Sequence, residues 1–239
     1  LFMYNFRTDL ALERREIFRK NNNLEEIDGI EIENKEIDPN LKVTKVDITN
    51  QNGEQAIGKP IGSYITIDIK KLRLAEEEEI QKSAEILAEE LKEIINKHIA
   101  PKDDILVVGL GNMYVTPDSL GPNDIDVTRH IIKYLPQYID ENSRPVSAIS
   151  PGVLGTTGIE TLEILEGVVK EINPKLLIVI DALASRSIER ISSTIQLSDT
   201  GIVPGAGVGN TRKEISQNTL GIPVIAIRNS NSCRECGSG

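Results

Sequence analysis

The chain has 239 residues, 39% of them hydrophobic, and a formal net charge of −10. This length suits one large domain or one domain with an appendage, and the apolar fraction is sufficient for a core. The negative charge, with no basic stripe to offset it, argues against a nucleic-acid-binding protein. Both cysteines, Cys233 and Cys236, lie in the last few residues, so no disulfide is expected in the body of the protein. The cysteine-free body fits a cytoplasmic protein. No secretory signal or apolar run of membrane-spanning length is visible.

Hydrophobic periodicity predicts short strands that alternate with helices. Apolar or alternating runs predict strands at residues 27–38, 42–49, 63–69, 105–108, 146–149, 176–181, 193–197 and 224–227. Helical spacing predicts helices at residues 10–17, 75–98, 127–135, 158–172 and 184–189, and residues 53–62 are rich in turn formers. This alternation predicts an α/β fold with a mostly parallel sheet flanked by helices, and with an N-terminal portion that forms a β-rich subregion or an antiparallel edge.

Two of the predicted strands each deliver an aspartate near the carboxyl end. Asp118 follows the strand at residues 105–108 after a glycine-containing turn, and Asp181 comes directly after Ile180. Ligands of open parallel sheets bind outside the carboxyl ends of the strands. Two aspartates close in space share one proton, so that one serves as general base and the other as general acid when water attacks an amide. Each aspartate taken alone also fits a turn or a helix N-cap.

Other motifs leave two alternatives open. His130, next to Arg129, fits either a metal ligand together with the two aspartates or a group that supports them. The glycine-rich stretch at residues 204–210 resembles a nucleotide-binding loop, although no Lys-Ser/Thr pair follows it. A metal-assisted peptidase and a glycine-loop nucleotide-binding module therefore remain as alternatives. With no cysteine in the body and only two histidines, Ser-His-Asp and Cys-His catalysis are disfavoured.

A series of longer motifs resembles the spore germination protease family. They read RTDLALE from Arg7, VGLGN from Val108, VTPDSLGP from Val115, VTRH from Val127, SPGVLGTTGIET from Ser150, IDALASRSIER from Ile180, TIQLSDTGI from Thr194, PGAGVGN from Pro204 and LGIPVIAI from Leu220. The motifs follow one another in a consistent order from about residue 7 to residue 227.

The resemblance implies an atypical aspartic endopeptidase that degrades the small acid-soluble proteins coating DNA in dormant spores. It implies that the catalytic pair is Asp118 and Asp181, and that the fold is related to the hydrogenase-maturation proteases. The family acts in the spore core as a homotetramer, and no metal, other cofactor, nucleic acid or membrane is expected as a partner. Residues expected to support the catalytic pair are Arg129, His130, Arg186 and Asp199.

The resemblance also implies a zymogen that processes itself. Asp9-Leu10 has an acidic residue before an apolar one, as processing sites of the family do. The expected cut between them separates a propeptide at residues 1–9 from a protease domain at residues 10–227. Because this leader is short, its removal is expected to cost little stability.

The end of the chain departs from the family. After Ile227 the family continues with a Gly-[Val/Ile]-Pro-Thr-Val-Val segment, whereas this chain reads RNSNSCRECGSG. Removing a single base from a coding sequence chosen to fit the chain restores Gly-Ile-Pro-Thr-Val-Val. Residues 228–239 are therefore interpreted as an out-of-frame tail on a C-terminally truncated protease domain.

Overall fold

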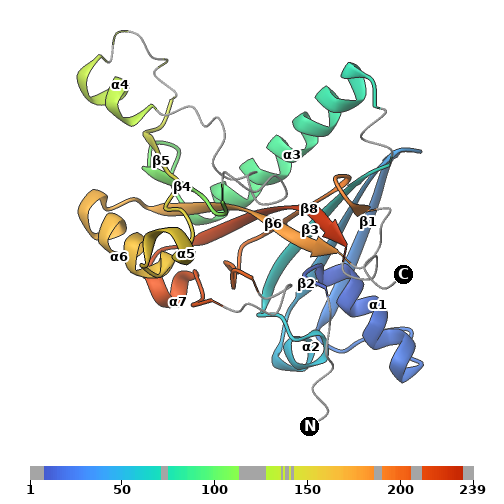
Figure 1. Ribbon diagram of the computed structural model, residues 1–239. Coiled ribbons are helices and arrows are strands. Elements are labelled where there is room, and N and C mark those ends of the chain that lie inside the picture. Colours follow the sequence, from blue (N-terminus) through green and yellow to red (C-terminus); the bar gives the residue numbers. More distant parts are fainter. Residues whose placement is uncertain are drawn as a thin grey trace.

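The computed structural model describes residues 8–70, 75–112, 128–135, 137, 140, 143–185, 190–205 and 212–233. Its helices are α1 (Ala11–Asn22), α2 (Gln51–Ile57), α3 (Glu77–His98), α4 (Arg129–Tyr134), α5 (Leu154–Thr157), α6 (Thr161–Ile172) and α7 (Gln217–Leu220). Its strands are β1 (Ile30–Asp38), β2 (Leu41–Ile48), β3 (Gly62–Ile69), β4 (Ile105–Gly109), β5 (Val146–Ile149), β6 (Leu176–Ser185), β7 (Thr194–Ser198) and β8 (Val224–Cys233). These strands form one sheet in the order β1-β2-β3-β7-β8-β6-β4-β5, with helices on both faces (Figure 1).

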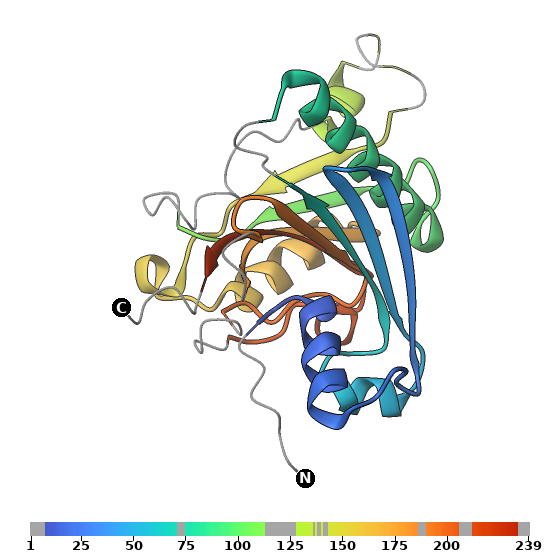
Figure 2. The same ribbon diagram turned by 90° about the vertical axis from the view of Figure 1, so that its right-hand side faces the viewer.

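The sheet has a parallel half and an antiparallel half. β8, β6, β4 and β5 run parallel to one another. β1, β2, β3 and β7 are antiparallel, and β7 also pairs antiparallel with β8, which joins the two halves. The expected α/β architecture is confirmed, but the expectation of a mostly parallel sheet is wrong. Periodicity indicates which side chains are buried and not the direction of a strand. Of the two expectations for the N-terminal strands, the antiparallel edge is the one found, because these strands extend the main sheet (Figure 2).

Alternate residues of the strands feed apolar clusters on opposite faces of the sheet. One face packs against α3, where Ile94 contacts a cluster that includes Ile67 and Ile178. The other face carries two clusters, one that includes Leu165 of α6 and one that includes Tyr64 with residues of α1 and α2. None of the described helices combines the length and the apolar character that a membrane span requires.

Three segments, α2, β6 and β8, are among those that differ from the sequence-based expectation. α2 overlaps the turn-rich stretch. It begins where Asn50 caps it, because the Asn50 side chain accepts the N–H groups of Asn52 and Gly53 at 2.9 and 3.1 Å. β6 continues through Ser185 into the start of the helix predicted at 184–189, of which residues 186–189 lie outside the described residues. β8 likewise continues past residue 227, so the predicted tail begins within a strand. The extended parts of β6 and β8 pair with each other. Because backbone groups make these hydrogen bonds, polar side chains do not interrupt the pairing.

Gly201 lies in the loop after β7, and a substitution there tests how closely this loop packs against its neighbour. Its φ is +77°, and a Cβ there would stand 2.3 Å from the carbonyl oxygen of Ile215. Gly158 has a similar φ of +71° but open space around it, so it serves as the control. We expect Gly158→Ala to lower the free energy of unfolding by about 1–2 kcal/mol through left-handed strain. Gly201→Ala should cost about 3 kcal/mol or more because a main-chain clash is added. Urea unfolding measures both, and equal losses would contradict the close contact.

Candidate active site

Asp181 lies at the point of the sheet where α/β proteins usually bind their ligands. β4 and β6 are parallel neighbours in the sheet. The strand that follows β4 in the chain, β5, lies on one side of this pair, and the strands that follow β6, which are β7 and β8, lie on the other side. Such a divergence opens a crevice at the carboxyl ends of the two strands. Asp181 follows Ile180, whose carbonyl accepts the N–H of Leu110 at 2.8 Å, and it is only 7% exposed. The sequence-based expectation placed Asp181 at the carboxyl end of its strand, whereas the structure places it within β6, one residue after the last pair with β4.

A cleft of about 360 Å³ is lined by Asp181. Part of its wall is the backbone of four glycines, which are Gly111, Gly152, Gly155 and Gly205. Glycine allows another main chain to approach closely because no Cβ stands in the way. The cleft therefore combines a buried carboxylate with a wall that an extended peptide can approach.

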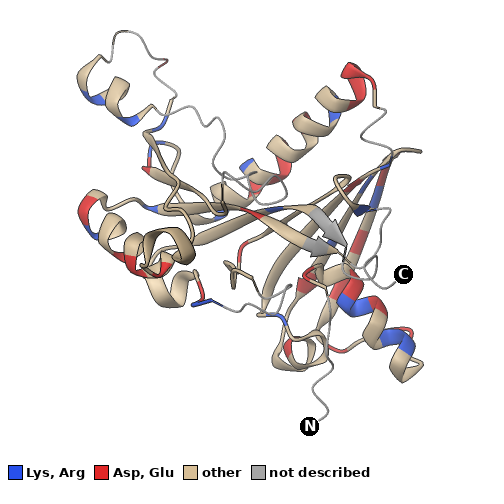
Figure 3. Cartoon of the chain, viewed as in Figure 1, with Lys and Arg blue, Asp and Glu red and all other residues tan. Residues whose placement is uncertain are grey.

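Strand register determines which residue faces Asp181. β6 and β8 each carry a single charged residue, Asp181 and Arg228, and the register sets these two side by side. Figure 3 shows how few charges the central strands carry compared with the helices. The pairing continues across the sheet as one row, formed by Asn34, Thr44, Thr66, Gln196, Arg228 and Asp181. These six residues, here called the polar row, cross the strands on the face of the sheet that carries the two separate apolar clusters.

Arg228 connects Asp181 to the N-terminal segment. Its Nη2 lies 3.1 Å from Oδ2 of Asp9 and 3.6 Å from Oδ2 of Asp181, and the residue is 5% exposed. Breaking a buried ion pair by removing one member typically costs about 3–5 kcal/mol. One buried guanidinium therefore holds two buried carboxylates that lie far apart in the sequence.

The predicted processing residues belong to this network. Thr8, Asp9 and Leu10 are all buried. The N–H of Ala11 donates to Oε1 of Gln196 at 3.0 Å, which fixes the start of α1 over the polar row. The side chain of Thr8 also donates to the carboxylate of Glu13. Thr8 and Asp9 therefore make specific contacts in the fold, and the small stability cost of removing the leader stays a prediction.

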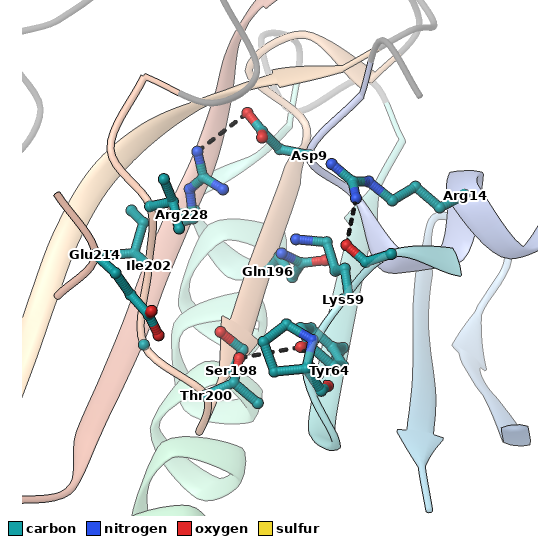
Figure 4. A pocket seen from close by; sticks show the side chains of 14 residues that line it. Asp9, Arg14, Lys59, Tyr64, Gln196, Ser198, Thr200, Ile202, Glu214 and Arg228 are labelled. Atoms are coloured by element: carbon teal, nitrogen blue, oxygen red, sulfur yellow. Dashed lines mark hydrogen bonds and ion pairs between the residues drawn. The ribbon is translucent and has the colours of Figure 1, made fainter. Parts of the chain in front are cut away.

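A second cavity, of about 170 Å³, is lined by Asp9 and Arg228 together with Arg14, Lys59 and Tyr64 (Figure 4). Lys59 is partly buried, and its Nζ lies 5.4 Å from the centroid of the Tyr64 ring. Burial, with the positive charges of Arg14 and Arg228, lowers the pKa of Lys59 from 10.5 to about 7, against the opposing effect of Asp9. Burial also raises the pKa of the Tyr64 hydroxyl. The cavity next to the Asp9 carboxylate is thus lined by two arginines and by a lysine that loses its proton more readily than usual.

The structure does not bring the other described candidates to Asp181. Arg129 forms an ion pair with Asp104 at 3.6 Å, and with His130 it lines a separate cavity beside α4. Asp199 accepts the N–H of Ser63 at 2.8 Å and so links the end of β7 to β3.

Asp118 and Arg186, the remaining candidates, lie outside the described residues. Within the described ranges, no group of three His, Cys, Asp or Glu side chains is arranged to hold a metal ion. Of the glycine-rich stretch at 204–210, Pro204 and Gly205 line the Asp181 cleft, and the following residues are not described.

Sequence reasoning missed Arg14, Lys59 and Arg228. Arg228 was assigned to the tail, yet a lone charge directly after the apolar run at 224–227 was an available signal, because a buried charge needs a partner. The sequence contained no comparable signal for Arg14 or Lys59, which reach the cavity from α1 and from the loop after α2.

These features define an α/β protein with a buried carboxylate in a cleft at the switch point of its sheet, an arrangement typical of enzymes. The sequence profile of the germination protease family matches residues 7–231. The chain therefore belongs to the germination protease family, which is a family of peptidases.

Individual relatives agree with this assignment. The germination protease of Clostridium perfringens (strain ATCC 13124) is 52% identical over 228 residues, which cover 94% of this chain and 69% of that protein. The germination protease of Priestia megaterium is 50% identical over 235 residues, covering 95% and 63%. That of Caldanaerobacter subterraneus is 48% identical over 230 residues, covering 95% and 69%. The family match includes residues 228–231, and the out-of-frame origin of residues 228–239 stays a prediction.

Lys59→Met tests the charge state of the second cavity. An amine whose pKa is lower in the folded than in the unfolded chain destabilises the fold increasingly as pH falls from 10.5 toward 7, and fully below about 7. Methionine keeps the long unbranched side chain of lysine but removes the charged amine. We therefore expect the free energy of unfolding of the wild-type chain to rise from pH 7 to pH 9 relative to that of Lys59→Met.

Urea unfolding at several pH values measures this difference. Lys82→Met is the control, because Lys82 on α3 pairs with Asp38 at an exposed position. The control should keep the pH dependence of the wild-type chain. Parallel curves for the wild type and Lys59→Met would contradict the lowered pKa.

Proposed function

We propose that this chain is an endopeptidase of spore germination that uses Asp118 and Asp181 to hydrolyse peptide bonds of small acid-soluble spore proteins. The observation that carries the proposal is the buried Asp181 at the switch point of the sheet, in a chain that belongs to the germination protease family. The glycine-walled cleft beside Asp181 supports it, since a protein substrate presents an extended main chain to such an enzyme.

In the proposed reaction one aspartate is ionised and the other is protonated. The ionised aspartate takes a proton from water, and the water oxygen attacks the scissile carbonyl carbon. The protonated aspartate gives its proton to the leaving nitrogen as the C–N bond breaks. Since a nearby cation favours an ionised carboxylate, the position of Arg228 beside Asp181 supports Asp181 as the base and leaves Asp118 as the acid.

The same site is proposed to process the chain between Asp9 and Leu10. Asp9 and Asp181 share one nitrogen of Arg228, which supports a position of the processing site close to the proposed base. Because Asp9 and Leu10 are buried, the cut requires movement of this segment. A covalently attached leader has a high effective concentration at the site, so weak contacts are enough to inhibit. The processed enzyme is proposed to work as a homotetramer in the cytoplasm of the spore core.

The catalytic pair is tested with Asp118→Asn and Asp181→Asn. Each variant should lower kcat on a spore-protein peptide by about 10³-fold or more, and the double variant should be hardly worse, because groups that act as one unit are not additive. Circular dichroism and urea unfolding check that the variants fold. A folded Asp181→Asn chain with near-normal activity would refute the assignment. Loss of wild-type activity in strong chelator would instead favour metal-assisted hydrolysis with the same aspartates.

Processing is tested by N-terminal sequencing after incubation over a range of pH. A carboxylate pair works only when one member is protonated, so mild acid should favour the cut. We expect a new N-terminus at Leu10 in the wild-type chain and none in Asp181→Asn. An enzyme fully active on spore-protein peptides that keeps its N-terminus at every pH would rule out Asp9-Leu10 as the processing site.

A further inference from the structure

A cavity of about 420 Å³ lies between α1 and the antiparallel half of the sheet. It shares no lining residue with the Asp181 cleft or with the cavity beside Asp9. Only two carboxylates line it, against five cationic side chains, which are Arg15, Arg19, Lys42, Lys70 and Arg190. This local excess of positive charge occurs in a chain whose net charge is −10. The cavity therefore attracts anions although the chain as a whole repels them.

Arg15 brings an unsatisfied donor to this cavity from α1. The residue is 8% exposed, and its buried Nε has no hydrogen-bond acceptor among the residues that the structure describes. Nearly all buried polar groups in proteins have a partner, because an unpaired one has lost its water without compensation. A buried guanidinium on the wall of a cavity therefore indicates a ligand that accepts hydrogen bonds and carries negative charge.

Arg190 brings a second unsatisfied donor. Its Nε lies 3.7 Å from Oε1 of Glu13, and its Nη2 lies 3.7 Å from Oδ2 of Asp68. Asp68 also accepts the hydroxyl of Thr194 at 2.6 Å. The Nη1 of Arg190 is buried and has no acceptor within the described part of the chain. Two carboxylates thus hold this guanidinium in place and leave one of its nitrogens for a further acceptor.

The cations come from several directions, which favours a phosphoryl group as the ligand. Arg15 and Arg19 belong to α1, Lys42 belongs to β2, and Lys70 directly follows β3. A phosphoryl group carries a charge of about −1.5 to −2 at pH 7 and offers three strong acceptor oxygens. A carboxylate offers two oxygens and a single charge. Arginine also pairs well with phosphate through two parallel N–H groups.

Part of the cavity wall is apolar. Leu12 of α1, Ile32 of β1 and Ile69 of β3 line it beside the cations. Leu12 and Ile69 are buried in the fold, whereas Ile32 is exposed. An apolar wall next to a cationic one suits a phosphate that carries a small organic group, because that group can leave water while the phosphate meets the cations.

We propose that this cavity binds the phosphoryl group of a small molecule, either free phosphate or a phosphate monoester, and that Arg15, Lys42 and Arg190 hold it. The bound group joins α1 to β2 and to the segment before β7, so it stabilises the packing of α1 on the sheet. The site is separate from the proposed peptidase chemistry, and its test requires no cleavage.

The test uses calorimetric titration and Tm with two probes, inorganic phosphate and glycerol 3-phosphate, against chloride at equal ionic strength. A ligand at ten times its Kd should raise the Tm of a chain of this size by about 3–6 °C. Lys42→Met should weaken binding about tenfold, the usual effect of losing one charge-assisted hydrogen bond. Lys45→Met is the matched control, because Lys45 lies on the other face of β2 and pairs with Asp47 at 3.3 Å. It should leave the Kd unchanged.

Arg15→Met gives a second, independent readout. In chloride this variant should have a Tm at least as high as that of the wild-type chain, because it removes a buried charge that lacks a partner. In phosphate the wild-type chain should gain Tm and the variant should gain much less. A purely structural Arg15 would instead lower Tm equally in both buffers.

The two probes also identify the source of the phosphoryl group. Tighter binding of glycerol 3-phosphate would support an organic phosphate that uses the apolar wall, and equal or tighter binding of inorganic phosphate would support the free ion. Absence of binding by both probes, or equal losses of affinity in Lys42→Met and Lys45→Met, would overturn the proposal.

Discussion

The ion pairs of Arg228 with Asp9 and Asp181 connect three parts of the molecule that the sequence separates widely. Asp9 precedes α1, Asp181 lies in β6 and Arg228 lies in β8, and all three are almost completely buried. Burying charges is costly unless their partners are in place. This constraint requires that the N-terminal segment, the two central strands and the candidate cleft adopt their positions together.

The polar row explains why the N-terminal segment is held differently from the rest of the fold. On the opposite face, apolar residues from several strands of the sheet pack against several residues of α3. Beneath the start of α1 the sheet instead presents Gln196 and Arg228, and the segment attaches through individual hydrogen bonds and ion pairs. Such contacts depend strongly on geometry, whereas apolar burial does not. A segment held in this way can be released when a few interactions change, without disruption of the apolar clusters.

The sequence predicted the elements better than their assembly. Hydrophobic patterning located the eight strands of the described residues, and the apolar run before Asp181 correctly indicated a buried strand. Strand direction and register are long-range properties, so the antiparallel pairing of β7 with β8 and the pairing of Asp181 with Arg228 were not predicted. α2 was missed because a single Asn50 cap decides its start. Arg14 and Lys59 could not be assigned, because their shared cavity exists only once α1, β3 and β7 pack together.

Proposed processing at Asp9 would change the electrostatics of this region on both sides of the cut. The new α-carboxylate would add a negative charge next to the carboxylate of Asp9, close to Arg228 and Asp181. The new α-amino group would place a positive charge on Leu10, which is fully buried and directly precedes α1. A cation is unfavourable at a helix N-terminus, where the macrodipole is positive, and a buried ammonium without a partner is more unfavourable still. Cleavage would therefore destabilise the contacts that hold the segment in place, so that breaking one peptide bond favours release of the leader from the cavity.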